Sequence, residues 1–233
     1  MRVIRGSRAE AESKAAERIA ALVARKPDCV LALSASEELR GVYAAAAKSG
    51  EDFSRCRVFV TEEFALDSGN LGKSRRAALE EMFLVPAHFS AANVIGMQPD
   101  GDADSECEKY ASLWQELGVD LAVLAIGEDG HVAFDEPLAG FDSTAHPTKL
   151  IESTQREECA AFDAASAPAR GMTAGIGEIM HAKSIVLCAF GAGKAETVER
   201  TVAGRAHISV PATLLQLHDD VDVYLDAESA SLI

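Results

Sequence analysis

The segment VDLAVLAIGEDGHVAFDEP, residues 119–137, decides the fold. Its first eight residues, 119–126, are almost wholly apolar, which is typical of a strand buried on both faces of a parallel sheet. The chain then turns at two glycines and presents Asp129, His131, Asp135 and Glu136. Ligands of open parallel sheets bind just beyond the carboxyl ends of the strands. The segment therefore predicts a catalytic site at the end of a central strand.

The rest of the chain alternates apolar runs with helical patterns. Strands are expected at 29–33, 56–61, 92–97, 119–126, 184–190 and 221–226, and helices at 7–25, 34–49, 104–117 and 195–202, with another beginning at Met172. A polar, alanine-rich segment at 154–168 is typical of a helix that covers an active site. The alternation predicts an α/β fold, with residues 1–233 forming a single domain. We expect a doubly wound, mostly parallel, Rossmann-like sheet flanked by helices.

Composition excludes several classes of function. The 233 residues carry a net charge of −15, so a basic surface for nucleic acid is not expected. No stretch approaches the roughly 20 apolar residues of a membrane span, and the first residues do not form a signal peptide, so we expect a cytoplasmic protein. The five cysteines are scattered without a C-x-x-C pair, and no histidine pair has ligand spacing. Neither a metal nor a cofactor is therefore predicted.

Three groups of residues carry candidate chemistry. His131 titrates near neutrality and suits proton transfer, and Asp129 or Glu136 would orient its ring. Glu62 and Glu63 follow the strand at 56–61, and strand ends in a parallel sheet share a crevice, so these carboxylates are placed to face His131 or, alternatively, form an acidic pair at a helix start. The sequence GAGK, residues 191–194, joins a strand to a helix and offers N–H groups and a lysine to an anion. It lacks the Ser or Thr that follows the lysine in a P-loop.

The segment GEDGHVAFDEP, residues 127–137, resembles the signature of the glucosamine-6-phosphate deaminase (isomerase) family, which usually has Asn at the position of Asp135. The related 6-phosphogluconolactonases share the Asp-Gly-His core and lack the continuation. The similarity extends over most of the chain. Residues 62–64, EEF, stand where the family has Asp-Glu-Tyr, residues 172–177 match its Thr-x-Gly-x-Gly segment, Lys194 matches its phosphate-binding lysine, and residues 215–218, LQLH, match its Leu-Gln-x-His.

The resemblance implies a reaction on a 2-amino-2-deoxy sugar 6-phosphate. The sugar ring is opened, the aldose is isomerised to a ketose imine, and the imine is hydrolysed to a ketose phosphate and ammonia. By position, His131 opens the ring with help from Asp129 and Glu136, and Glu62 replaces the aspartate that moves a proton between C2 and C1. The substrate contacts implied by position are Ser34, Ser36, Glu63, Gly130 and Lys194.

Two departures from the family bear on the phosphate. The family's Gly-(Ser or Gly)-Thr-Pro loop is replaced here by residues 34–38, SASEE, so Glu37 and Glu38 stand where a dianion binds. The family's lid arginine falls near Ala161, with Arg156 and Arg170 as the nearby substitutes. We therefore expect glucosamine 6-phosphate to bind weakly or not at all, and the ligand to lack phosphate or to carry a positive group near Glu37 and Glu38.

Two other functions stay open at this point. A 6-phosphogluconolactonase needs no proton shuttle between carbons and would tolerate Glu62. A non-catalytic sugar-binding regulatory module would tolerate the altered loop at 34–38. In each case the expected partner is a small sugar or sugar phosphate, and neither nucleic acid nor a membrane. An oligomer is compatible with the sequence.

Overall fold

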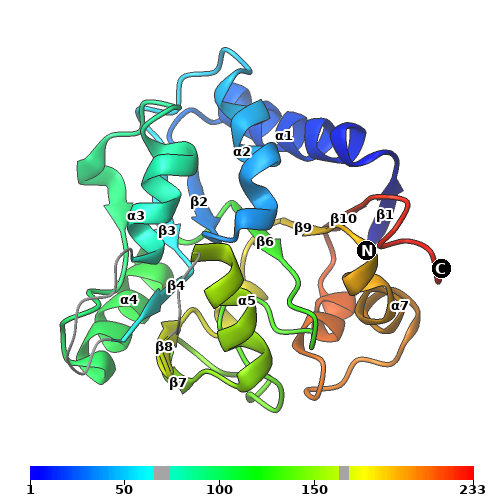
Figure 1. The fold of residues 1–233 in the computed structure, drawn as a ribbon. Coiled ribbons are helices and arrows are strands. Elements are labelled where there is room, and N and C mark those ends of the chain that lie inside the picture. The colour runs from blue at the N-terminus through cyan, green and yellow to red at the C-terminus, as the bar shows by residue number, and fades with distance from the viewer. Residues whose placement is uncertain (66–73, 163–167) are drawn as a thin grey trace.

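The centre of the molecule is a seven-stranded sheet (Figure 1). The computed structural model describes residues 1–65, 74–162 and 168–233, without the side chains of residues 161 and 162. Neighbouring strands of this sheet run parallel throughout. They stand in the order β1-β10-β9-β6-β2-β3-β5, with the bounds β1 Arg2–Arg5, β2 Val30–Leu33, β3 Arg57–Val60, β5 Val94–Ile95, β6 Leu121–Ala125, β9 Ile185–Ala189 and β10 Val221–Leu225.

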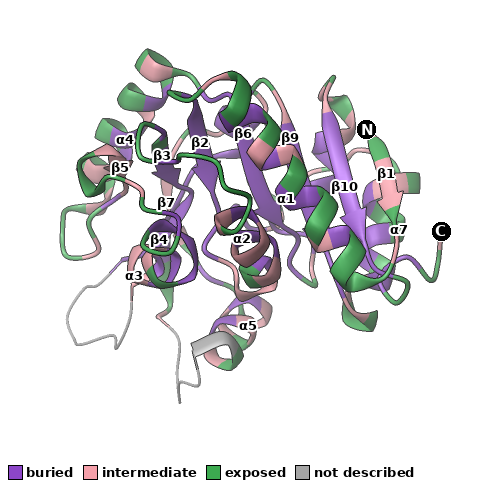
Figure 2. Ribbon diagram, turned by 90° about the horizontal axis from the view of Figure 1, so that it is seen from above, coloured by how far each residue is buried: buried purple, intermediate pink, exposed green. Residues whose placement is uncertain are grey.

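Helices cover both faces of this sheet, and successive side chains of a strand point to opposite layers. In β6, Leu121 and Val123 pack in one hydrophobic core, whereas Ala122 and Leu124 pack in the other. Figure 2 shows the buried strands between the half-exposed helices. The first core is completed by α1 (Arg8–Arg25), α2 (Arg40–Ala47) and α3 (Arg75–Leu79), and the second by α4 (Ala103–Leu117), α6 (Ile176–Ile179) and α7 (Ala195–Ala203). This arrangement confirms the predicted doubly wound α/β fold.

Local sequence explains where the longest helix begins. Ser7 caps α1, since its hydroxyl accepts a hydrogen bond from the Glu10 N–H, and the Glu10 carboxylate in turn accepts from the Ser7 N–H. This is the capping box that the sequence predicted. Ala11, Ala15 and Ile19 then follow at helical spacing and are buried.

A second, smaller sheet was not expected. Strands β4 (Glu62–Phe64), β8 (Arg170–Thr173) and β7 (His146–Lys149) pair antiparallel in that order. The prediction of a helix beginning at Met172 is therefore wrong. The helix α6 begins only at Ile176. Just before it, the chain passes close to the loop that contains Ser143, because a Cβ on Gly175 would lie 2.1 Å from the Ser143 carbonyl oxygen.

The loops after β2, β6 and β9 meet at the carboxyl ends of three adjacent strands. Helix α5 (Glu152–Phe162) lies over this edge (Figure 1), and its start agrees with the covering helix expected at 154–168; residues 163–167 of that prediction lie outside the described residues. In the described parts of the chain, no helix has both the length and the apolar composition needed to cross a bilayer.

Candidate active site

The loop after β6 folds back so that His131 lies against the strand end. The Gly127 N–H donates to the His131 carbonyl at 2.9 Å, and Gly130 completes the turn with φ +93°. A Cβ on Gly127 would lie 2.1 Å from the imidazole ring, and one on Gly130 would lie 2.3 Å from Val210. These two glycines thus provide the space for His131 and for the close approach of Val210, and the predicted contact of Gly130 with substrate stays a prediction.

Asp129 and Glu136 lie beside His131, as the sequence predicted. The Asp129 Oδ1 lies 2.8 Å from His131 Nδ1 and accepts the His131 N–H at 3.0 Å. Thr154 of α5 donates to Glu136 Oε2 at 3.0 Å, and its hydroxyl lies 3.3 Å from His131 Nδ1. The hydroxyl of Ser153 donates to Asp129 Oδ2. Two neighbouring hydroxyls of α5 therefore fix both carboxylates of the cluster.

The charges of this cluster are set by burial and by contact. Burial acts against a charged His131, but the hydrogen bond and charge of Asp129 outweigh it and raise the pKa of His131. The same partner holds the pKa of Asp129 well below its usual range although burial opposes this. Burial raises the pKa of Glu136. Two carboxylates with opposite pKa shifts beside one histidine are typical of an acid–base site.

The same three side chains could hold a metal by geometry alone. Asp129, His131 and Glu136 offer ligand atoms within 4.8 Å of one another. Three protein ligands are the number found at catalytic zinc sites. Each side chain already has a described hydrogen-bond partner, however, so the acid–base role accounts for the arrangement without a metal.

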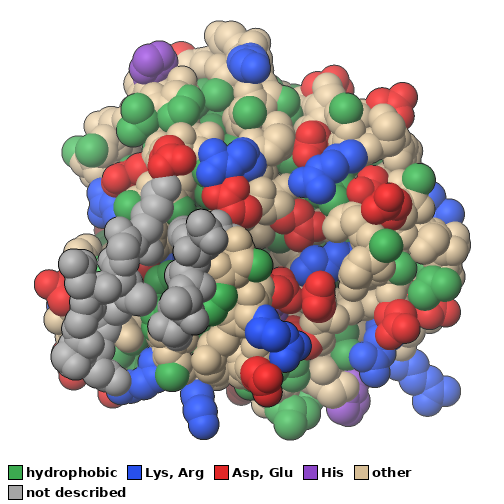
Figure 3. Space-filling model, in the orientation of Figure 1, with side chains coloured by type: hydrophobic (Ala, Val, Ile, Leu, Met, Phe, Trp, Pro, Cys, Tyr) green, Lys and Arg blue, Asp and Glu red, His purple; other side chains and the backbone are tan. Residues whose placement is uncertain are grey.

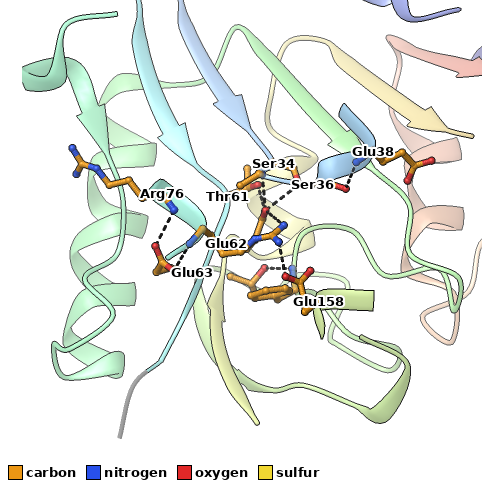
Figure 4. Close-up of polar contacts among 12 residues, drawn as sticks. Ser34, Ser36, Glu38, Thr61, Glu62, Glu63, Arg76 and Glu158 are labelled. Carbon is orange, nitrogen blue, oxygen red and sulfur yellow. Dashed lines mark hydrogen bonds and ion pairs between the residues drawn. The ribbon is translucent and has the colours of Figure 1, made fainter. Parts of the chain in front are cut away.

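Glu62 and Glu63 point to opposite sides of β4, as successive residues of a strand do (Figure 4). The Glu62 carboxylate is fully buried and accepts from the Ser34 hydroxyl at 3.0 Å and the Ala35 N–H at 2.7 Å. Arg75 donates to it at 3.0 Å, and the Thr61 hydroxyl also donates. Glu62 is therefore directed at the loop after β2, and within the described residues no direct hydrogen bond joins it to His131.

Glu63 has a structural task. Its carboxylate accepts the N–H groups of Phe64, Arg75 and Arg76, so it binds the first turn of α3 (Figure 4). A carboxylate at this end of a helix is stabilised by the helix dipole. For Glu63 this matches the alternative that the sequence left open, an acidic residue at a helix start, whereas the Glu62 carboxylate binds the loop after β2.

The altered loop at 34–38 lies at the pocket, as predicted. Ser34 and Ser36 line it together with Glu38, and the Ser36 hydroxyl accepts the Glu38 N–H at 3.3 Å. The Glu38 carboxylate accepts the N–H of Phe190, the residue that follows β9. Burial raises the pKa of Glu38 to about 7, against the lowering effect of Lys194. Glu38 thus binds the backbone N–H group that directly precedes residues 191–194, the predicted anion site.

Two ion pairs formed by α5 were not predicted. Lys194 Nζ lies 3.1 Å from Glu157 Oε2, and the buried Arg75 contacts Glu158 as well as Glu62. The spacing of these residues in the sequence could have indicated that they share one side of a helix. Glu157 follows Ser153 by four residues, and Glu158 follows Thr154 by four, which places all of them toward one side of α5.

The cavity between these side chains is small. It has a volume of about 30 Å³. Its lining comes from the loop after β2, from Arg75, from the end of β6 with the loop that bears His131, and from Glu157 and Glu158 of α5. Ligand pockets commonly measure about 300–1,000 Å³, so a sugar phosphate fits only if side chains move. Figure 3 shows acidic and basic side chains intermingled around the centre of this face.

A sequence model of the family described as glucosamine-6-phosphate isomerases/6-phosphogluconolactonase matches residues 7–224. The chain belongs to this family. The resemblance inferred from residues 127–137 is thereby confirmed.

Members of the glucosamine-6-phosphate isomerase/6-phosphogluconolactonase family that resemble this chain include two named glucosamine-6-phosphate deaminase. That of Thermoanaerobacter sp. (strain X514) is 35% identical, with 96% of this chain and 91% of the relative covered. That of Beutenbergia cavernae is 36% identical, with 96% and 88% covered. A solved monomeric glucosamine-6-phosphate deaminase superposes with a TM-score of 0.95 at 29% identity, with 100% of both chains covered. The 6-phosphogluconolactonase of Trypanosoma brucei, with a TM-score of 0.77 at 16% identity and 99% and 97% covered, shares the fold.

Asp135, where the family usually has Asn, gives a prediction about stability. Its carboxylate is fully buried and accepts the Ile176 N–H at 2.8 Å, and burial raises its pKa to about 7. A carboxylate with a raised pKa binds its proton in the folded state, so it costs stability increasingly as the pH rises from about 4 to 7. We expect Asp135→Asn to raise the free energy of unfolding by roughly 2–4 kcal/mol at about pH 8, and by less than half as much at about pH 5.

Urea unfolding at both pH values measures this effect. The exposed Asp100, changed to Asn, serves as the control and should leave the free energy of unfolding within about 0.5 kcal/mol of the parent. An equal gain from Asp135→Asn at both pH values would show that ionisation of Asp135 is not the cause.

Proposed function

We propose that this enzyme isomerises and deaminates 2-amino-2-deoxy sugar 6-phosphates, with glucosamine 6-phosphate as the substrate to be tested first. The observation that carries the proposal is the hydrogen-bonded cluster of Asp129, His131 and Glu136 at the carboxyl end of β6. The relatives named glucosamine-6-phosphate deaminase support it, since they match almost the whole length of the chain.

The cluster suits the first step, the opening of the sugar ring. This step removes the proton of the anomeric hydroxyl and delivers a proton to the ring oxygen. His131 can carry that proton, because Asp129 keeps its ring oriented and raises its pKa. Glu136 belongs to the same cluster, and burial raises its pKa as well. It is therefore our candidate for a second group that carries a proton.

The later steps move a proton from C2 to C1 and add water to the resulting imine, which releases ammonia. Glu62 is our candidate for the proton transfer, by its place in the sequence. Its carboxylate shares Arg75 with Glu158, which lines the cavity. Lys194, which pairs with Glu157 of the cavity lining, is the candidate for binding phosphate, and Ser34 and Ser36 of the same lining are candidates for further contacts.

The proposal is tested by measuring ammonia release from glucosamine 6-phosphate. We expect turnover with a Michaelis constant in the millimolar range, because carboxylates of the chain itself occupy Lys194 and the N–H groups near it. Glucosamine without phosphate and 6-phosphogluconolactone are the comparison substrates. A micromolar Michaelis constant would contradict the expected weak binding, and hydrolysis of the lactone without ammonia release would favour a lactonase.

We also propose that one chain suffices for activity; the structurally similar deaminase, which is described as monomeric, supports this. A charged sugar phosphate does not cross a lipid bilayer unaided, which supports a cytoplasmic place of action.

A further inference from the structure

The candidate phosphate subsite is occupied by carboxylates of the same chain. Glu157 of α5 accepts from two donors at once: Lys194 Nζ at 3.1 Å through Oε2, and the Glu128 N–H at 2.7 Å through Oε1. Glu38 accepts the neighbouring Phe190 N–H. Lysine side chains and backbone N–H groups are the donors that a phosphate uses. Glu157 therefore makes the contacts that a substrate's phosphate would make.

The position of Glu157 is fixed by the rest of its helix. Ser153 and Thr154, one turn earlier, bind Asp129 and Glu136 of the catalytic cluster. Because residues four apart lie on one side of a helix, this anchoring directs Glu157 at the loop that bears Lys194. Lys194 is well covered, with 12% of its side chain exposed, and the remaining cavity of about 30 Å³ holds roughly one water molecule.

Phosphate and Glu157 cannot both use these donors. A phosphate dianion beside a carboxylate is strongly repelled when both are partly desolvated. The side chain of Glu157 must leave Lys194 before a phosphate binds there, and the cost of breaking its two contacts is subtracted from the affinity for the ligand.

We propose that Glu157 is a specificity-determining residue that acts as a built-in competitor for the phosphate of the substrate. The carboxylate lowers the affinity for every phosphorylated ligand at Lys194 and leaves the affinity for the unphosphorylated sugar unchanged. This inference rests on the proposed function for the identity of the substrate, and on the contacts of Glu157 for the competition.

The test replaces Glu157 with glutamine, which keeps its length and its ability to accept the Glu128 N–H. We expect Glu157→Gln to lower the dissociation constant of inorganic phosphate, measured by titration calorimetry, by about tenfold or more. The Michaelis constant for glucosamine 6-phosphate should fall by a similar factor. Glu157→Asp, which keeps the charge on a shorter side chain, should give an intermediate affinity.

Glu152→Gln is the matched control. Glu152 begins the same helix, its side chain is 89% exposed, and it pairs with Arg156 on the surface. It should leave the phosphate affinity unchanged. A dissociation constant for phosphate within about twofold of the parent in Glu157→Gln, with the variant folded by circular dichroism, would overturn the inference.

The two proposals fail in different ways. Tighter phosphate binding by Glu157→Gln without ammonia release by any form of the protein would uphold the competition and refute the deaminase. Ammonia release by the parent with unchanged phosphate affinity in Glu157→Gln would refute the competition and uphold the deaminase.

Discussion

Replacing His131 with glutamine is expected to lower kcat for glucosamine 6-phosphate by a factor of about 10²–10⁴, the range that a positioned acid–base group contributes. Glutamine cannot carry the proton from the anomeric hydroxyl to the ring oxygen. Its amide can still donate to Asp129, so the loop after β6 should keep its fold. Steady-state ammonia release gives kcat, and a thermal melt shows whether the variant remains folded.

The control is His88→Gln, since His88 is exposed. Its kcat should equal that of the parent.

A pH profile adds a second readout, because Asp129 raises the pKa of His131 and so keeps the ring protonated to higher pH. In Asp129→Asn the acidic limb of kcat/KM should therefore move to lower pH. An unchanged kcat in His131→Gln would remove His131 from the mechanism.

Replacing Arg75 with methionine is expected to lower the free energy of unfolding by about 3–5 kcal/mol. Arg75 is buried and pairs with Glu62 and Glu158, whose carboxylates are buried too. Removing one member of a buried ion pair leaves uncompensated charge in the interior. Urea unfolding of the parent and the variant measures the loss.

Arg76→Met is the matched control, because Arg76 is the neighbouring residue and its side chain pairs with Glu80 near the surface. It should cost less than about 1 kcal/mol. The loss in Arg75→Met should shrink as the pH falls toward 5, since burial raises the pKa of Glu158 and an unpaired carboxylate takes up a proton more readily. A loss as small as that of Arg76→Met would mean that the buried pairs contribute little.

The apolar pattern of residues 119–126 predicted the central strand and, with it, the place of the site. Hydrophobic periodicity reports burial, and β6 is buried on both faces, so this signal is strong. The cluster around His131 was also predictable, because its members lie within one short loop. This part of the site can therefore be predicted from a short stretch of sequence.

The contacts of Arg75, Glu157 and Glu158 could not be predicted in the same way. They join α3 and α5 to strand ends far away in sequence, so their pairing depends on how the small antiparallel sheet and α5 pack against the main one. The strand β8 was missed for a similar reason. Its four residues include glycine and arginine, and pairing with β4 and β7 decides their conformation.

The edge of the main sheet has a consequence for synthesis of the protein. Strand β1 pairs with β10, and Arg2 binds Asp220 and Asp222 there. A ribosome adds about 5–20 residues per second, so the first strand waits roughly 10–40 s for its partner to be made. During that interval α1 can already pack on α2 and β2, while the N-terminal strand stays unpaired. The pairing of β1 with β10 can therefore form only after most of the chain has been made.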